Sequence, residues 1–178
     1  MTGATTNASS ITSKPKPNLT LARVKFKDGI NYHINQQYAK AIQLYDEAIA
    51  INPNYSMAYS NKGISLDELG KKQEAIKAYN RAIEINPKFT DAYVNKGTVL
   101  NELGKNIESI ACYDKAISID SRYTGAYYNK GNALKCLGQY EKVIEMQNIV
   151  IKLEPNHDLA HFAKAVALHC LGRPMESI

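Results

Sequence analysis

Residues 56–89 read SMAYSNKGISLDELGKKQEAIKAYNRAIEINPKF, and this 34-residue stretch decides the fold. Its first half shows helical spacing over 59–66, and Gly70 then stops the helix, as glycine does just past a C-terminus. Its second half is amphipathic over 75–83, and Pro87 ends that run because proline cannot continue a helix. The stretch therefore predicts a hairpin of two helices joined by a tight turn.

The pattern of this stretch recurs along the chain. The tripeptide Asn-Lys-Gly returns every 34 residues, at 61–63, 95–97 and 129–131. Self-similarity at a fixed period is typical of solenoids, in which each unit packs only on its neighbours. The period divides the chain into four full units and an incomplete fifth: 22–55, 56–89, 90–123, 124–157 and 158–178. We predict an all-α fold in which antiparallel helix pairs stack into a superhelical solenoid.

Glycine and tyrosine occupy fixed places in the unit. Glycine fills the eighth position of all four full units, although a glycine inside a helix costs about 1 kcal/mol relative to alanine. Its recurrence indicates that the two helix axes approach each other closely. A tyrosine column at the twenty-fourth position, made of Tyr45, Tyr79 and Tyr113, is expected to supply bulk at the interface between neighbouring units.

The first twenty residues lie outside the repeat. Residues 1–20 are rich in Thr, Ser, Asn, Lys and Pro and nearly lack large apolar side chains. Such a segment cannot bury enough surface to offset the entropy of the chain. We therefore expect a disordered N-terminal tail over 1–20 and a repeat domain over 21–178.

The repeat resembles that of the tetratricopeptide-repeat (TPR) family. The family pattern has an aromatic at position four, glycine at eight and fifteen, a large residue at eleven, alanine at twenty and 27, an aromatic at 24 and proline at 32. The second unit matches at every one of these positions: Tyr59, Gly63, Leu66, Gly70, Ala75, Tyr79, Ala82 and Pro87. The resemblance covers residues 22–178 and implies a TPR solenoid.

The resemblance also implies a function and a set of binding residues. A TPR solenoid holds an extended peptide segment of another protein in a concave groove, which is lined by the first helix of each unit. We expect such a scaffold or adaptor; the alternative is the substrate-recruiting repeat arm of a larger enzyme whose catalytic domain lies outside this chain. The family's groove positions give these candidate residues: Asn61, Asn95, Asn129, Asn132, Tyr128, Asp67, Glu68, Asp91, Glu102, Phe26 and Ile30.

Three of the candidates form a ladder. Asn61, Asn95 and Asn129 share position six of their units. A side-chain amide both donates and accepts hydrogen bonds, so it can bind the backbone of a guest peptide without reading its side chains. Each net bond contributes only about 1 kcal/mol, so the ladder alone gives modest affinity. The competing interpretation is that these amides are simply hydrated.

The charges of the groove positions predict the kind of guest. Asp67, Glu68, Asp91 and Glu102 gather in the central units, so we expect a basic or polar segment; an ordinary solvated face is the competing interpretation. The apolar anchors would be Tyr128, Phe26 and Ile30. The chaperone-binding subgroup of the family uses a clamp of Lys, Arg and Asn side chains. Only the central asparagine of that clamp is present here, so we do not expect a chaperone tail as the guest.

Composition argues against other classes of function. The net charge of +5 forms no basic stripe, and no run approaches 18 apolar residues, so we expect neither nucleic-acid binding nor a membrane span. The three cysteines form no Cys-x-x-Cys pair, and His157 and His161, one helical turn apart, lack the glutamate of a His-Glu-x-x-His motif. No catalytic constellation appears. We expect no metal, no cofactor and no enzyme activity. The cysteine usage and the lack of a secretory signal indicate a reducing, cytoplasmic compartment.

The incomplete fifth unit leaves one end of the solenoid open. Its helix carries Phe162, Val166 and Leu168, where the cap of a solenoid is normally polar. Either the chain is a fragment of a longer protein, which we favour, or this helix contacts another chain.

Overall fold

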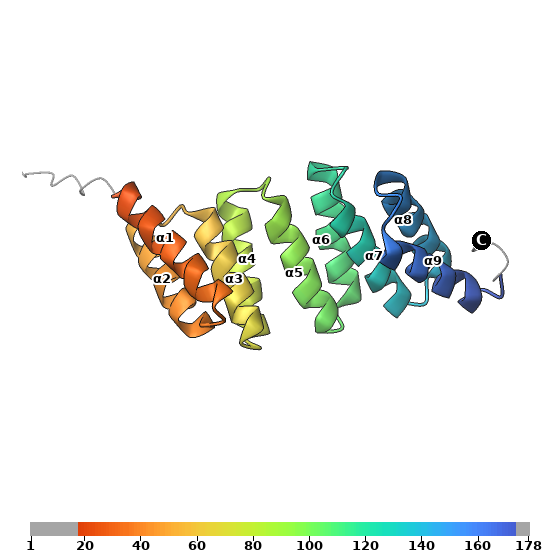
Figure 1. Cartoon of the computed structure of the whole chain (residues 1–178), viewed down its shortest axis with the longest axis horizontal. Helices are drawn as coiled ribbons and strands as arrows, with labels where there is room; N and C mark the ends of the chain where they lie inside the picture. Colours follow the sequence, from red (N-terminus) through yellow and green to blue (C-terminus); the bar gives the residue numbers. More distant parts are fainter. Residues whose placement is uncertain (1–17, 174–178) are drawn as a thin grey trace, which may run out of the picture.

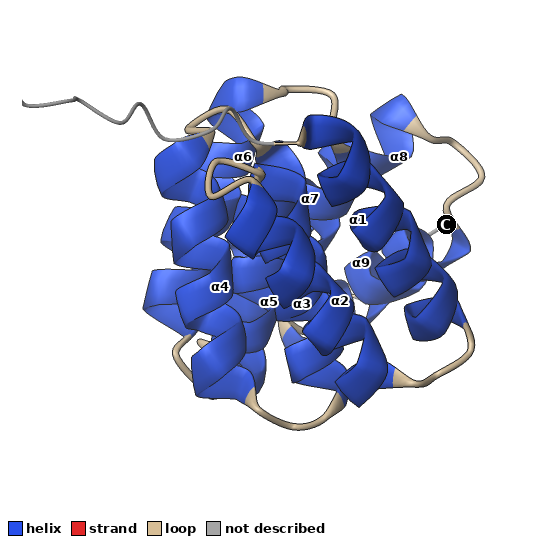
Figure 2. Ribbon diagram, turned by 90° about the vertical axis from the view of Figure 1, so that its left-hand side faces the viewer, coloured by secondary structure: helices blue, strands red, loops and turns tan. Residues whose placement is uncertain are grey.

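The computed structural model describes residues 18–173, and within them the chain is a row of helix pairs (Figure 1). The helices are α1 (Leu19–Ile34), α2 (Tyr38–Ile51), α3 (Ser56–Glu68), α4 (Lys72–Ile85), α5 (Thr90–Glu102), α6 (Asn106–Ile119), α7 (Thr124–Cys136), α8 (Tyr140–Leu153) and α9 (Asp158–Cys170). Viewed from the α1 end, this part of the chain consists of helices and loops without strands (Figure 2). The predicted all-α solenoid of antiparallel pairs is confirmed.

The first helix begins earlier than the predicted tail allows. α1 begins at Leu19, and the side chain of Asn18 accepts a hydrogen bond from the backbone N–H of Leu21 at 3.0 Å. Asparagine is a good N-cap residue because it satisfies one of the unpaired donors of the first turn. Residues 19 and 20 therefore belong to the repeat domain. The rest of the predicted tail, 1–17, and the last residues of the fifth unit, 174–178, lie outside the described residues.

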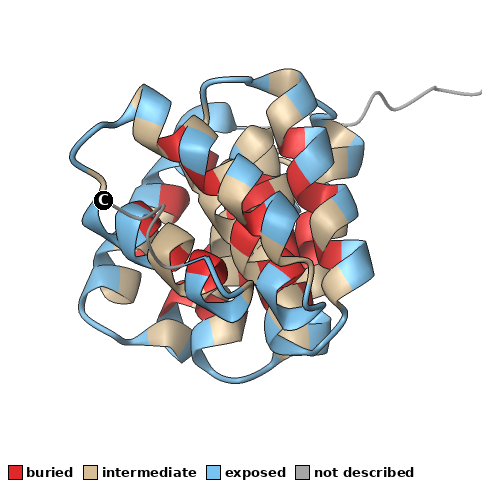
Figure 3. Ribbon diagram, turned by 90° about the vertical axis from the view of Figure 1, so that its right-hand side faces the viewer, coloured by how far each residue is buried: buried red, intermediate tan, exposed pale blue. Residues whose placement is uncertain are grey.

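The odd-numbered helices form the inner wall of the stack. Each helix packs against the next one in the chain. In addition, α1 touches α3, α3 touches α5 and α5 touches α7, while no comparable contact joins the even-numbered helices of the described chain. Successive odd-numbered helices thus lie closer together than successive even-numbered ones, so the odd-numbered layer is on the inside of the curve. Buried residues lie on the faces between helices, and exposed residues lie around the outside (Figure 3).

Within a unit, the helix pair closes on a contact between glycine and tyrosine. A Cβ atom at Gly29 or Gly63 would lie 2.6 Å from Cε1 of Tyr45 or Tyr79, and one at Gly97 would lie 2.7 Å from Cε1 of Tyr113. The three rings are fully buried. Since a real Cβ cannot approach a ring this closely, only glycine lets the ring pack against the backbone of the first helix.

The fourth unit breaks this arrangement. Gln147 takes the place of the tyrosine, and its amide nitrogen lies where a Cβ of Gly131 would be. Gln147 is 0% exposed, and neither its amide nitrogen nor its amide oxygen has a hydrogen-bond partner among the described residues. An unpaired buried amide costs about 1–3 kcal/mol. The α7–α8 pair therefore buries an unpaired amide at the place where each of the first three pairs buries a tyrosine ring.

Two ion pairs at equivalent places join neighbouring units. Lys62 Nζ on α3 lies 2.6 Å from Asp46 Oδ1 on α2, and Lys130 Nζ on α7 lies 2.5 Å from Asp114 Oδ1 on α6. Both aspartates are about half exposed, and exposed pairs contribute only about 0–1 kcal/mol each. The pairs fix how neighbouring units align more than they stabilise the fold.

The turn between α1 and α2 differs from the later ones. Gly104 ends α5 with φ of 73°, whereas Gln36 holds the corresponding place after α1 with φ of 59°. The left-handed region costs an L residue roughly 1–2 kcal/mol. The first unit thus makes the same turn without the residue that favours it.

Replacing Gly97 with alanine tests the contact with the tyrosine ring. We expect Gly97→Ala to lower the free energy of unfolding by about 1–3 kcal/mol, the usual cost of overpacking, in urea denaturation followed by circular dichroism. Gly131→Ala is the matched control, because the end of the Gln147 side chain can turn aside and alanine adds up to about 1 kcal/mol of helix propensity. Equal losses in the two variants would contradict this role of the ring.

Replacing Gln147 with tyrosine should restore the column. The ring fits beside a glycine in the three preceding units, and the unpaired amide is removed, so we expect Gln147→Tyr to raise the free energy of unfolding by about 1–3 kcal/mol. Thermal and urea unfolding measure this change. Gln73→Tyr, at an exposed position of α4, should stay within about 0.5 kcal/mol of the parent. A lower unfolding midpoint for Gln147→Tyr would show that the site requires the amide.

Candidate functional site

The inner wall contains an open hollow of about 390 Å³ between α3 and α5. Its lining residues are Met57, Ser60, Asn61 and Ile64 from α3, Asp91 and Asn95 from α5, and Phe89 and Tyr123 from the loops that precede α5 and α7. Three of these residues, Asn61, Asp91 and Asn95, are among the predicted groove residues. The hollow therefore lies on the predicted concave face.

A small side chain explains why the hollow occurs in this unit. The fifth position of the other full units holds Phe26, Val94 or Tyr128, and each packs beneath the aromatic residue that closes its own unit. The ring centroids are 4.9 Å apart for Phe26 and Tyr55 and 5.3 Å apart for Tyr128 and His157, and Val94 packs in the cluster that includes Tyr123. In the second unit this place holds Ser60, which is 2% exposed. Ser60 and Phe89 both line the hollow, and the serine side chain is smaller than those at this position in the other units.

The predicted asparagine ladder is half-buried, and the hollow takes in part of it. Asn61 and Asn95 line the hollow, while Asn129 and Asn132 lie farther along, on α7. The Asn61 side chain donates to the backbone oxygen of Met57 at 2.9 Å. The side chains of Asn95 and Asn129 have no hydrogen-bond partner within residues 18–173. These two amides retain both donor and acceptor for a guest.

The four acidic residues that were predicted to gather in the groove lie in two places, and two of them pair with a lysine. Lys72 Nζ lies 3.0 Å from Asp67 Oδ1 and also forms an ion pair with Glu102. Hydrogen bonds to Glu102 and then to Asp67 raise the pKa of Lys72 above its usual value. Asp67 and Glu102 are therefore already engaged by a cation of the protein itself, and their contact with a guest stays a prediction. Glu68 is exposed nearby, at the end of α3.

The fourth acidic residue lies at the other end of the helix. Asp91 begins α5 and Glu102 ends it, about 16 Å apart at 1.5 Å per residue. Asp91 is exposed, and its Oδ1 accepts a hydrogen bond from the Tyr123 hydroxyl at 2.8 Å. Burial, followed by this hydrogen bond, raises the pKa of Tyr123 to about 12. Tyr123 therefore stays a neutral donor at physiological pH and fixes the orientation of the carboxylate.

Two of the three predicted apolar anchors are committed to packing. Phe26 is 6% exposed and lies in the core with Tyr45 and Ala41, so its assignment to the groove surface was wrong. Ile30 is half-buried and packs against the same cluster. Tyr128 is half-buried beside His157. The cause at Phe26 is that its side chain turns towards Tyr55, the closing aromatic of its own unit, rather than towards the groove.

Sequence reasoning missed Lys72, Tyr123 and Phe89. Lys72 begins α4, whereas its acidic partners lie on α3 and α5, and the two aromatic residues lie in loops rather than on the inner helices. Only one signal was available in the sequence: a bulky residue precedes the first helix in every unit from the second onward.

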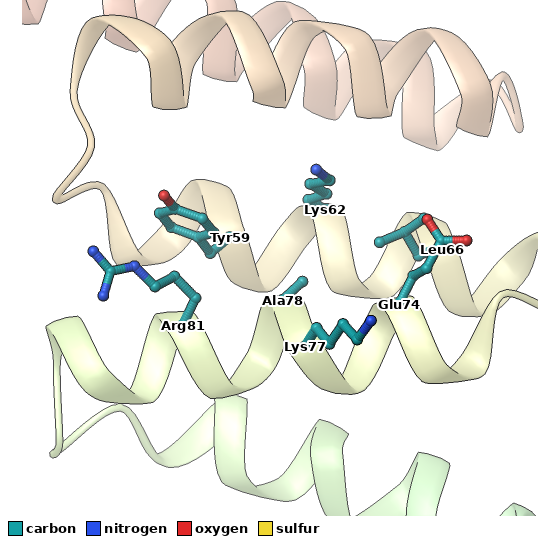
Figure 4. A pocket seen from close by; sticks show the side chains of 7 residues that line it. All are labelled: Tyr59, Lys62, Leu66, Glu74, Lys77, Ala78 and Arg81. Atoms are coloured by element: carbon teal, nitrogen blue, oxygen red, sulfur yellow. The ribbon is translucent and has the colours of Figure 1, made fainter.

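A second hollow, of about 360 Å³, lies where α3 and α4 run side by side (Figure 4). It is lined by Tyr59, Lys62, Leu66, Glu74, Lys77, Ala78 and Arg81. Several of its charges already have partners: Lys62 pairs with Asp46, and Arg81 pairs with Glu84 at 2.8 Å and lies 6.0 Å from the centroid of the Tyr59 ring. None of these residues lines the α3–α5 hollow, so this hollow is a separate feature of the surface.

The terminal helix presents a smaller apolar face than predicted. Phe162 is 69% exposed, but Leu168 is buried at 1% and Val166 is half-buried. Leu168 packs inwards because α9 docks on α8 as each earlier odd-numbered helix docks on its predecessor. A partner contact through α9 stays a prediction.

Two further properties concern residues 18–173. Over this range no three His, Cys, Asp or Glu side chains are grouped so that they could hold a metal ion. Among the described helices, none is both long and apolar enough to cross a bilayer.

Family models match most of the chain. Models described as tetratricopeptide repeat match residues 56–89, 78–111 and 124–157, and a model described as TPR repeat matches residues 29–70 and 97–138. Together these matches run without a gap from residue 29 to residue 157. No curated protein sequence matches the chain.

Solved structures of low sequence identity share the architecture. MamA 41-end from Desulfovibrio magneticus RS-1 has 18% identity and a TM-score of 0.81, covering 92% of this chain and 91% of that one. YrrB, described as a TPR protein with an unusual peptide-binding site, has 18% identity and a TM-score of 0.73, covering 90% and 83%. The first TPR of Spaghetti (RPAP3), bound to the HSP90 peptide SRMEEVD, has 24% identity and a TM-score of 0.64, covering 66% and 93%. At these identities the likeness shows the fold alone.

Removing Lys72 tests the ion-pair cluster. We expect Lys72→Met to lower the free energy of unfolding at pH 7 and low salt by about 0.5–1 kcal/mol, as for a partly exposed network. The raised pKa of Lys72 means that this stabilisation is fully present at neutral pH and is lost only as the pH rises through the lysine pKa.

The loss should shrink in 1 M NaCl, where the screening length falls to about 3 Å. Lys71→Met, at the exposed neighbouring position, is the control and should show no salt-dependent loss. If salt changed the unfolding free energy of both variants alike, the ion pairs of Lys72 with Asp67 and Glu102 would not stabilise the fold.

Proposed function

Because the chain belongs to the tetratricopeptide-repeat family, we propose that it is an interaction scaffold whose inner face binds an extended segment of another protein. The main support for this proposal is the side-chain amide of Asn95, which lines the hollow between α3 and α5 without a hydrogen-bond partner among the described residues. A half-buried amide without an internal partner is ready to bond a guest backbone. Asn129, on the next odd-numbered helix, offers the same group.

The spacing of the ladder suits an extended peptide. Neighbouring inner helices pack about 8–10 Å apart, and an extended chain rises about 3.3 Å per residue. Successive asparagines would therefore meet the guest backbone at about every third residue. The guest side chains between those points would face the wall, where the α3–α5 hollow offers room for one of them.

The similar structures support this function at a coarse level. YrrB is described as having a peptide-binding site, and the RPAP3 domain binds an HSP90 peptide. The peptide in the RPAP3 complex, SRMEEVD, is acidic at its end. The hollow of this chain has one charged lining residue, the carboxylate of Asp91. We therefore propose a guest of a different kind, one that lacks acidic side chains where it passes Asp91.

The ladder is tested by removing two of its amides. A peptide selected against the protein from a phage-displayed random library, labelled with fluorescein, reports affinity by fluorescence anisotropy. We expect Asn95→Ala combined with Asn129→Ala to weaken binding roughly 30-fold, because two bonds of about 1 kcal/mol each are lost.

Asn148→Ala, at an exposed position of α8, is the matched control and should bind like the parent. Urea denaturation checks that the double variant keeps its fold. Unchanged affinity in a folded double variant would sink the proposal that these amides hold the guest.

A further inference from the structure

We propose that the hollow between α3 and α5 is a specific site for an arginine side chain of the guest segment. The inference rests on the proposed function, because the arginine would belong to the peptide held along the inner wall. It adds what the asparagines cannot supply, namely selection of one side chain. Three features of the hollow carry it: its volume, the apolar part of its wall and its single fixed charge.

The room for a guest side chain is associated with a small residue, Ser60. The fifth-position residues of the other full units, Phe26, Val94 and Tyr128, fill the corresponding place with their own side chains. The hollow that Ser60 lines together with seven other residues has an open volume of about 390 Å³, within the range of about 300–1,000 Å³ typical of ligand pockets. The site is therefore peculiar to the second unit rather than a property of every unit.

The walls suit a long side chain with an aliphatic stem. Met57 is 48% exposed, and Ile64 and Phe89 are half-buried, so apolar surface remains uncovered there. An arginine stem can cover such surface while its charged end stays near water. The planar guanidinium can also stack on the aromatic face of Phe89.

The charge selects a cation. Asp91 is the only ionised residue among the eight that line the hollow. The Tyr123 hydroxyl occupies one oxygen of its carboxylate at 2.8 Å and holds the group in place. The carboxylate keeps free lone pairs, which a guanidinium can use in a two-pronged hydrogen bond. Lysine offers a point charge without this planar match, so arginine fits better.

Three nine-residue peptides test the site directly. They are identical Gly- and Ser-rich sequences with a leucine on each side of a central arginine, citrulline or glutamate; citrulline keeps the shape of arginine without its charge. Two-dimensional ¹H–¹⁵N NMR titration measures their dissociation constants into the millimolar range. We expect arginine to bind about tenfold tighter than citrulline, glutamate to bind weakest, and the signals of Ser60, Asn95 and Tyr123 to shift.

Two variants assign the effect to named residues. Asp91→Asn should bring the ratio of the arginine to the citrulline dissociation constant close to one, while citrulline binding stays unchanged. Ser60→Val, which copies the residue of the third unit, should weaken arginine and citrulline alike by about fivefold or more. Glu145→Gln, at an exposed position of α8 outside the inner wall, is the charge-matched control and should keep the tenfold ratio. The unfolding midpoint of each variant confirms that it is folded.

The outcomes separate the two proposals. Equal binding of arginine and citrulline to the parent, or a tenfold ratio that survives Asp91→Asn, overturns the arginine site. If all three peptides still shift the Asn95 and Asn129 signals equally, the groove function stands without that site. If no peptide shifts Asn95 or Asn129, both proposals fall.

Discussion

The structure depends on one packing constraint, the contact between a glycine of the first helix and a tyrosine ring of the second. The ring lies where a Cβ would be, as for Gly63 and Tyr79, so the two backbones can approach only because the side chain is absent. This contact fixes how the helices of a pair pack. Repetition of the same pair then fixes the stack, because each unit contacts only its neighbours. An inner wall of odd-numbered helices follows from that repetition.

Local departures from the repeat give the stack its individual properties. Gln147 replaces a packed ring with an amide that has no partner, which weakens the fourth pair. Ser60 replaces a large side chain with a small one, which opens a hollow on the inner wall. In a regular solenoid, a single substitution at a fixed position thus creates either a weakness or a site, depending on whether the position faces a partner helix or the groove.

Charged groups on the inner wall are partly used by the protein itself. Asp67 and Glu102 share Lys72 at one end of the helices, whereas Asp91 at the other end is held by a neutral hydroxyl. One lysine offsets one of the two negative charges that it contacts, whereas a hydroxyl only orients a carboxylate. Both ends of the wall therefore stay acidic, but Asp67 and Glu102 are already engaged by a cation and Asp91 is not.

The sequence by itself determined the helical units, their period of 34 residues and the close approach of the paired helices at glycine, because each of these is written in one short stretch and then repeated. It placed the tyrosine column between neighbouring units, whereas the structure packs each ring on the glycine of its own unit. It also placed Asn61 and Asn95 on one face, since a helix has a fixed periodicity. Only the tertiary structure decided that Phe26 is buried, that Lys72 pairs with two carboxylates and that Tyr123 holds Asp91. These contacts join residues from different helices and loops, up to 32 positions apart. They depend on how one element is rotated against the next, and periodicity within a helix does not encode that rotation.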